Sequence, residues 1–131
     1  MLEEELLSEA KKAMVHAYVP YSSFRVGAAV MAEDGTIFTG CNVENASYGG
    51  TCCAERIAIY KAVSEGYRKF LSILIISDSE DITYPCGICR QVLVEFMGDG
   101  DVLCCNKYGE IKKYKLRDLI PYAFEFNPQM R

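Results

Sequence analysis

The chain of 131 residues is half hydrophobic and 24% charged, which is the composition of a globular protein and predicts one domain over residues 1–131. It has no run near the roughly 18 apolar residues that a membrane helix needs, and the acidic residues 3–5 have the wrong charge for a secretory leader. We therefore expect a cytoplasmic protein without a membrane partner. The net charge of −4 disfavours binding to polyanions, so no nucleic-acid partner is expected.

Helical and strand-like periodicities alternate along the chain. Residues 4–18 predict an amphipathic helix, because apolar residues recur at helical spacing between Glu and Lys residues; Pro20 ends the pattern. The remaining expected elements are strands at 25–31 and 36–43, a helix at 53–65, a strand at 71–77, a helix at 87–97, strands at 102–106 and 111–115, and a short helix at 116–120. Strands separated by helices predict an α/β fold, a three-layer α/β/α sandwich around a mixed sheet.

Seven cysteines are unusual for a chain of this size. An odd number argues against a closed set of disulfides, and the expected compartment is reducing. Such cysteines serve as metal ligands, as catalytic thiols or as small buried residues.

Three of these cysteines lie at predicted helix starts. Cys53 begins one helix, and the Cys-x-x-Cys pair Cys86 and Cys89 begins another. Backbone N–H groups and the helix dipole favour thiolate at such positions. Three thiolates on one zinc ion would leave the fourth tetrahedral position for water, as in catalytic sites.

A carboxylate stands beside this predicted metal site. Glu55 follows Cys53 by two residues, and a carboxylate there could move the protons of a zinc-activated water. Three thiolates and Zn²⁺ together leave a net negative charge, so a cation should lie nearby. We expect Arg56 to pair with the thiolates, although Arg90 also follows a ligand directly.

Less specific interpretations of these residues exist. The three cysteines could be a redox pair plus an inert thiol, or a structural zinc site, and Glu55 could serve only as a carboxylate at a helix start. Asn42 and Glu44 lie on one side of a predicted strand end, where spacing alone favours a polar turn.

The combination of motifs resembles the zinc-dependent nucleoside deaminases, in which Cys-Ala-Glu is followed by Pro-Cys-x-x-Cys. Nearly the whole chain resembles the small, three-cysteine, homotetrameric cytidine deaminases. The matching segments are Phe24-Arg25-Val26-Gly27-Ala28-Ala29, Gly40-Cys41-Asn42-Val43-Glu44-Asn45-Ala46, Cys53-Ala54-Glu55-Arg56, Pro85-Cys86-Gly87-Ile88-Cys89-Arg90-Gln91, and Leu119-Ile120-Pro121 with Phe124.

The resemblance implies a five-stranded sheet and a function for each matching residue. Cys53, Cys86 and Cys89 would bind one Zn²⁺ per subunit, and Glu55 would be the catalytic acid and base. The residues implied to bind substrate are Phe24 at the pyrimidine, Asn42 and Glu44 at the ribose hydroxyls, the Ala54 carbonyl at the polar edge of the base, and Ala46, Tyr48 and Phe124 from neighbouring subunits of a homotetramer. Phe126 could be confused with Phe124 in this assignment.

The other cysteines are expected to be small, buried residues and not ligands. They are Cys41, Cys52, Cys104 and Cys105. Cys52 adjoins Cys53, but consecutive side chains diverge and the deaminase pattern selects the cysteine two before Glu55.

The resulting hypothesis is a cytidine deaminase of pyrimidine salvage that converts cytidine, and also 2′-deoxycytidine, to the uridine product and ammonia. One alternative is a deaminase of a modified cytosine nucleoside of the blasticidin S type, which shares the zinc motifs. Another is a non-catalytic zinc module, which would have a fourth ligand and no need of Glu55. An enzyme that edits nucleic acids is disfavoured by the acidic charge balance.

Overall fold

The computed structural model describes residues 2–126 and has the alternating helices and strands that the periodicity predicts. In chain order the elements are α1 (Leu2–Met14), β1 (Val26–Ala32), β2 (Ile37–Cys41), the 3₁₀ turn η1 (Tyr48–Gly50), α2 (Ala54–Ser64), β3 (Phe70–Ser77), α3 (Gly87–Met97), β4 (Asp101–Cys105), β5 (Ile111–Lys115) and α4 (Leu116–Leu119).

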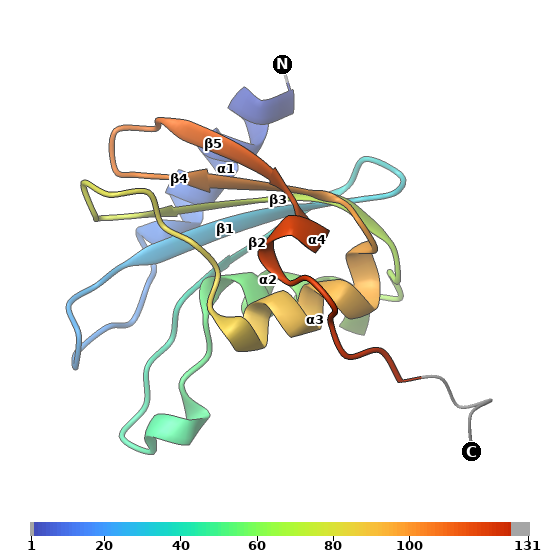
Figure 1. The fold of residues 1–131 in the computed structure, drawn as a ribbon. Helices are drawn as coiled ribbons and strands as arrows, with labels where there is room; N and C mark the ends of the chain where they lie inside the picture. Colours follow the sequence, from blue (N-terminus) through green and yellow to red (C-terminus); the bar gives the residue numbers. More distant parts are fainter. Residues whose placement is uncertain (1, 127–131) are drawn as a thin grey trace.

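The strands form one five-stranded mixed sheet in the order β2-β1-β3-β4-β5 (Figure 1). β1 is antiparallel to both β2 and β3, and β4 is parallel to β3 and antiparallel to β5. Since β2 and β3 are each antiparallel to β1, they run in the same direction. The helices that follow them, α2 and α3, therefore begin at the same end of the sheet.

Helices cover both faces of the sheet, as predicted. α1 packs on one face through Leu6 and Ala10, which join a buried cluster with Leu74 and Ile76 of β3. α2, α3 and α4 cover the opposite face over a larger apolar core. β3 is buried along nearly its whole length because it is covered on both sides. The expected three-layer sandwich is confirmed.

Two glycines allow the helices to lie close to the sheet. A Cβ on Gly27 would lie 2.2 Å from the Ala10 carbonyl oxygen in α1. A Cβ on Gly40 would lie 2.4 Å from the Ala54 carbonyl oxygen at the start of α2. Because Gly40 has no side chain, the N-terminus of α2 can pack directly against the backbone of β2.

The first helix is shorter than predicted. It ends at Met14 and not at Tyr18, because the amides of His16 and Ala17 bond to Ala13 and Met14 in turns. Tyr18 instead forms a bridge with Val43. Among residues 2–126, no helix is long and apolar enough to cross a membrane.

Candidate active site

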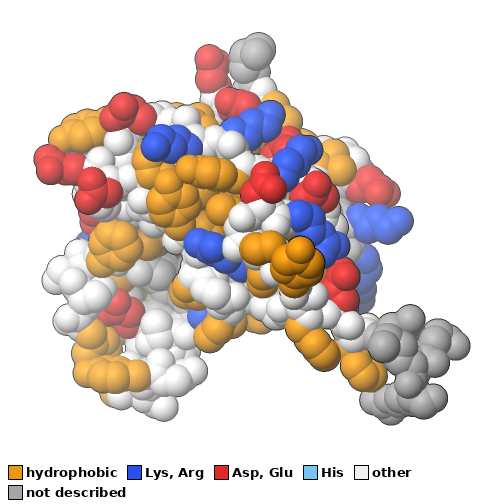
Figure 2. Space-filling model, viewed as in Figure 1, with side chains coloured by type: hydrophobic (Ala, Val, Ile, Leu, Met, Phe, Trp, Pro, Cys, Tyr) orange, Lys and Arg blue, Asp and Glu red, His pale blue; other side chains and the backbone are white. Residues whose placement is uncertain are grey.

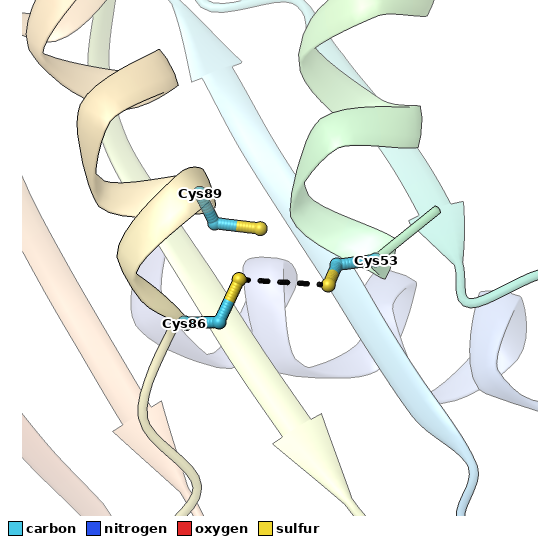
Figure 3. A group of neighbouring side chains, drawn as sticks. All are labelled: Cys53, Cys86 and Cys89. Atoms are coloured by element: carbon cyan, nitrogen blue, oxygen red, sulfur yellow. Dashed lines mark hydrogen bonds between the residues drawn. The ribbon is translucent and has the colours of Figure 1, made fainter. Parts of the chain in front are cut away.

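The three predicted ligand cysteines meet at the shared end of the sheet. Cys53 is the N-cap of α2, Cys86 is the N-cap of α3, and Cys89 lies in the first turn of α3. Their Sγ atoms all lie within 4.8 Å of one another, and those of Cys53 and Cys86 are 3.7 Å apart (Figure 3). Two helix starts thus direct three sulfurs to one point.

This arrangement fits a zinc ion. Two sulfurs bound to tetrahedral zinc at about 2.3 Å lie about 3.8 Å apart, which matches the separation of the Cys53 and Cys86 sulfurs. Hydrogen bonds from Cys89, Arg56 and Cys86 lower the pKa of Cys53 to about 5, despite the opposing effect of burial. Cys53 is therefore stabilised as the thiolate, the form that binds metal, whereas the hydrogen bond to Cys53, together with burial, raises the pKa of the Cys89 thiol.

Arg56 supplies the positive charge that the thiolates require. Its Nη2 atom donates to Cys53 Sγ at 3.4 Å. Arg90, the other candidate, instead donates from Nε to the Pro85 carbonyl at 2.8 Å and from Nη1 to the Leu119 carbonyl at 2.6 Å. Arg90 thus ties the segment before α3 to the end of α4, whereas Arg56 contacts a sulfur.

Glu55 is buried beside the sulfur cluster. The residue is only 4% exposed and lies in the first turn of α2. Burial raises the pKa of Glu55 to about 7, in the range where a carboxyl group can both accept and donate a proton near neutral pH.

A cavity of about 210 Å³ opens next to Glu55. Phe24, Asn42 and Ala54, all predicted to bind substrate, line it together with Cys53 and Cys86. The structure therefore brings these predicted residues, the acid and two of the sulfurs into one cavity. A mainly apolar cavity with a few convergent polar groups is typical of small-molecule sites.

Asn42 and Glu44 hold the segment that precedes β1. Asn42 Oδ1 accepts from the Val26 amide at 2.9 Å, and its Nδ2 donates to the Phe24 carbonyl at 2.8 Å. Glu44 accepts from the amides of Tyr21 and Ser22 and from the Ser22 hydroxyl. Hydrogen bonding by Ser22 in particular lowers the pKa of Glu44 below its ordinary value.

Glu44 and Tyr48 line a second cavity, with Tyr21, Ser22 and Thr51. Thr51 also lines the cavity beside Glu55, so the two cavities adjoin. The predicted sugar carboxylate is thus next to the predicted base site.

The remaining predicted residues lie away from the Glu55 cavity. Ala46 and Tyr48 belong to a loop that projects from the body of the protein, and Phe124 belongs to the projecting C-terminal segment (Figure 1). Tyr48 is 73% exposed and Phe124 is 70% exposed. Hydrophobic side chains cover parts of both projections (Figure 2). The Phe124 carbonyl accepts from Gln91 Nε2 at 2.7 Å, which anchors this segment to α3.

Several cavity residues were not predicted from the sequence. Those lining the Glu55 cavity are Val26, Thr51, Cys52, Thr83 and Tyr84. Tyr84 comes two residues before the predicted ligand Cys86 in the sequence, and this proximity could have predicted that it lines the cavity. The contact between Ser22 and Glu44 spans 22 residues of sequence, and no local pattern indicates it.

The four cysteines predicted not to be ligands lie outside the sulfur cluster. Cys104 and Cys105 are buried in β4, while Cys41 and Cys52 are half-buried. Burial raises the pKa of Cys104 to about 12 and that of Cys105 to about 11, which keeps both thiols protonated. Cys52 lines the cavity, but its sulfur is not among the three that converge.

The chain is similar to known deaminases over almost its full length. Residues 1–105 match the family model described as the cytidine and deoxycytidylate deaminase zinc-binding region. A cytidine deaminase of Sporosarcina psychrophila is 51% identical over 122 residues, which is 92% of this chain and 90% of that protein. A crystal structure of cytidine deaminase from Burkholderia pseudomallei is 43% identical, with a TM-score of 0.91 over 95% of this chain and 100% of that one. A blasticidin-S deaminase of Bacillus cereus is 34% identical over 110 residues, 78% of each chain.

Proposed function

The chain belongs to the zinc-binding cytidine and deoxycytidylate deaminase family, and from this we propose that it hydrolyses cytidine and 2′-deoxycytidine to uridine and 2′-deoxyuridine, releasing ammonia. The identity of 51% to a cytidine deaminase, compared with 34% to a blasticidin-S deaminase, supports the ordinary nucleoside as substrate.

One observation carries the proposal: the buried residue Glu55 lines a cavity together with Cys53 and Cys86, two members of the three-sulfur cluster. Cys53, Cys86 and Cys89 would hold Zn²⁺, which when bound supplies a water that is nucleophilic near neutral pH. A purely structural zinc site would have no use for a buried acid in an adjoining cavity.

Glu55 moves the protons of the reaction. It accepts a proton from the attacking water and delivers it to N3 of the cytosine ring, which makes C4 more electrophilic. The second proton of the water then passes through Glu55 to the amine that leaves C4. Water thereby contributes the new C4 oxygen, and the amine departs as ammonia.

The cavity walls orient the nucleoside. The exposed face of Phe24 packs against the pyrimidine. The Ala54 carbonyl, predicted to contact the base, faces Gly40 and Ala58 inside the protein, so Ala54 meets the base through the helix start, where backbone N–H groups have no partner within the helix. Glu44 accepts from a ribose hydroxyl, and Asn42 uses the donor and acceptor capacity that its two backbone contacts leave free.

We further propose that the enzyme acts as a homotetramer in the cytoplasm. Ala46, Tyr48 and Phe124 would complete the sites of neighbouring subunits. Their exposure on projecting segments, outside the Glu55 cavity of their own chain, supports this role, although Tyr48 also lines the adjoining Glu44 cavity. Large exposed aromatic side chains are common at interfaces between proteins.

An ultraviolet absorbance assay on purified protein tests the function, with zinc quantified in the same sample. We expect one zinc per chain and faster turnover of cytidine and 2′-deoxycytidine than of blasticidin S. Faster turnover of blasticidin S would support the alternative substrate. A zinc-loaded protein that deaminates none of the three would refute the proposal.

A further inference from the structure

The carboxylate of Glu44 is fixed by one short segment of chain, residues 21 and 22. Oε1 accepts from the Tyr21 amide at 2.9 Å and from the Ser22 amide at 3.1 Å. Oε2 accepts from the Ser22 hydroxyl. A carboxylate has about four acceptor positions, so these contacts use both positions of Oε1 and one of Oε2.

The Ser22 hydroxyl donates one hydrogen bond and accepts another. An ionised carboxylate can only accept, so the hydroxyl proton must point to Glu44. The oxygen of the same hydroxyl accepts from the Phe24 amide at 3.0 Å. Ser22 therefore links the predicted sugar carboxylate to the backbone of the residue that lines the base cavity.

After the contacts that residues 2–126 make with Glu44, one acceptor position remains, on Oε2 beside this hydroxyl. Glu44, Ser22 and Thr51 line one cavity, and Thr51 also lines the cavity that contains Glu55. A nucleoside whose base occupies the Glu55 cavity therefore has its sugar near Oε2.

We propose that Ser22 is a positioning residue, whose hydroxyl orients Glu44 so that its one free acceptor position faces a sugar hydroxyl of the substrate. The proposal rests on the proposed function. It assigns Ser22 to recognition of the sugar and not to the chemistry at C4. The lowered pKa of Glu44, for which Ser22 is the main cause, agrees with this role because an ionised carboxylate is the stronger acceptor.

Kinetics on two substrates test the proposal. The substrates are cytidine and 2′,3′-dideoxycytidine, which lacks the sugar hydroxyls. For Ser22→Ala we expect KM for cytidine to rise about tenfold with kcat changed far less, because a hydrogen bond to a charged group is misaligned. The preference for cytidine over the dideoxynucleoside should fall by a similar factor. A merely structural role would lower activity on both substrates equally.

Two variants serve as comparisons. Ser22→Thr keeps the hydroxyl and should keep the preference for cytidine. Ser23→Ala removes a hydroxyl from the next residue, which is exposed and lines neither of the two cavities, and should behave as wild type. Zinc content and thermal unfolding of each variant show whether it is folded.

A double substitution tests whether Ser22 acts through Glu44. In a Glu44→Gln background, Ser22→Ala should change the preference little further, since the group that it orients is already altered. The inference is overturned if Ser22→Ala keeps the full preference for cytidine, if it lowers both activities equally, or if Ser22→Thr also loses the preference. A wild-type protein inactive on cytidine would instead refute the proposed function itself.

Discussion

The guanidinium of Arg56 lies against the sulfur of Cys53, with 3.4 Å between Nη2 and Sγ. The two residues are one helical turn apart at the start of α2, so the contact forms as soon as that turn does. Arg56 Nε is buried and, within the part of the chain that the structure describes, has no hydrogen-bond partner. The contact with the sulfur cluster, and not an ordinary salt bridge, therefore accounts for the position of this cation.

Removing the charge of Arg56 should weaken the enzyme without unfolding it. For Arg56→Gln we expect activity or zinc affinity to fall about 10- to 100-fold, the usual effect of losing a group that supports a metal ligand. Arg56→Lys keeps the charge and should retain more of both properties. Steady-state kinetics and competition with a zinc chelator measure them. Equal losses in the two variants would mean that the charge is irrelevant.

Glu55→Gln tests the proton transfers. The amide is nearly isosteric but cannot accept a proton from water, so kcat should fall about 100- to 10,000-fold. Zinc content should stay at one per chain because Glu55 is not a ligand. Glu95→Gln makes the same chemical change at an exposed site on α3, and it should leave kcat unchanged. Near-wild-type turnover of Glu55→Gln would remove this residue from the mechanism.

Zinc content distinguishes the ligand cysteines from the others. Cys89→Ala removes one of the three converging sulfurs and should yield protein with little zinc and no activity. Cys104→Ala alters an equally buried cysteine outside the cluster, and metal analysis should still find one zinc per chain. Loss of zinc from Cys104→Ala, with Cys89→Ala still loaded, would contradict the assignment.

Gly40→Ala should destabilise the protein and disturb the site together. The new Cβ would lie 2.4 Å from the Ala54 carbonyl and 2.6 Å from the Ala58 amide, both of which are backbone atoms that cannot rotate away. We expect a loss of about 1–3 kcal/mol in the free energy of unfolding, the typical cost of overpacking. Urea denaturation measures it. In Gly87→Ala the Cβ meets nothing within 4 Å, and stability should not fall.

The lowered pKa of Glu44 predicts a pH dependence of stability. Its ordinary value is 4.5, and the Ser22 hydrogen bond, followed by the backbone contacts, holds it lower in the folded protein. Ionised Glu44 therefore stabilises the fold above pH 4.5, and this contribution disappears as the pH falls through the lower, native pKa. The difference in unfolding free energy between wild type and Glu44→Gln should shrink from pH 7 toward acid. A difference that stays constant would rule out the linkage.

Local patterns were sufficient for most elements and for the metal ligands. The helix at 87–97 and the strand at 111–115 have the predicted bounds, since a Pro-Cys start and a Gly turn mark them directly. Ligand chemistry and helix starts also identified the three cysteines that converge. The end of α1 was wrong because Ala17 continues the helical spacing although it is buried by a turn.

Contacts between distant segments were beyond the reach of these patterns. Asn42 bonds to Phe24 and Val26, and Glu44 bonds to Ser22, across gaps of 16 to 22 residues. Spacing placed the two polar side chains on one side of the chain but could not identify their partners. The second role of these residues, as supports for the segment before β1, emerges only from the packing.

The three sulfurs are carried by helices whose positions are already set by apolar packing against the sheet and by the close approach at Gly40. The scaffold is therefore complete before any ion arrives, unlike that of a zinc finger, which folds only around its metal. A chelator should remove the zinc and abolish activity while leaving the circular dichroism spectrum unchanged. Added zinc should then restore turnover without a refolding step.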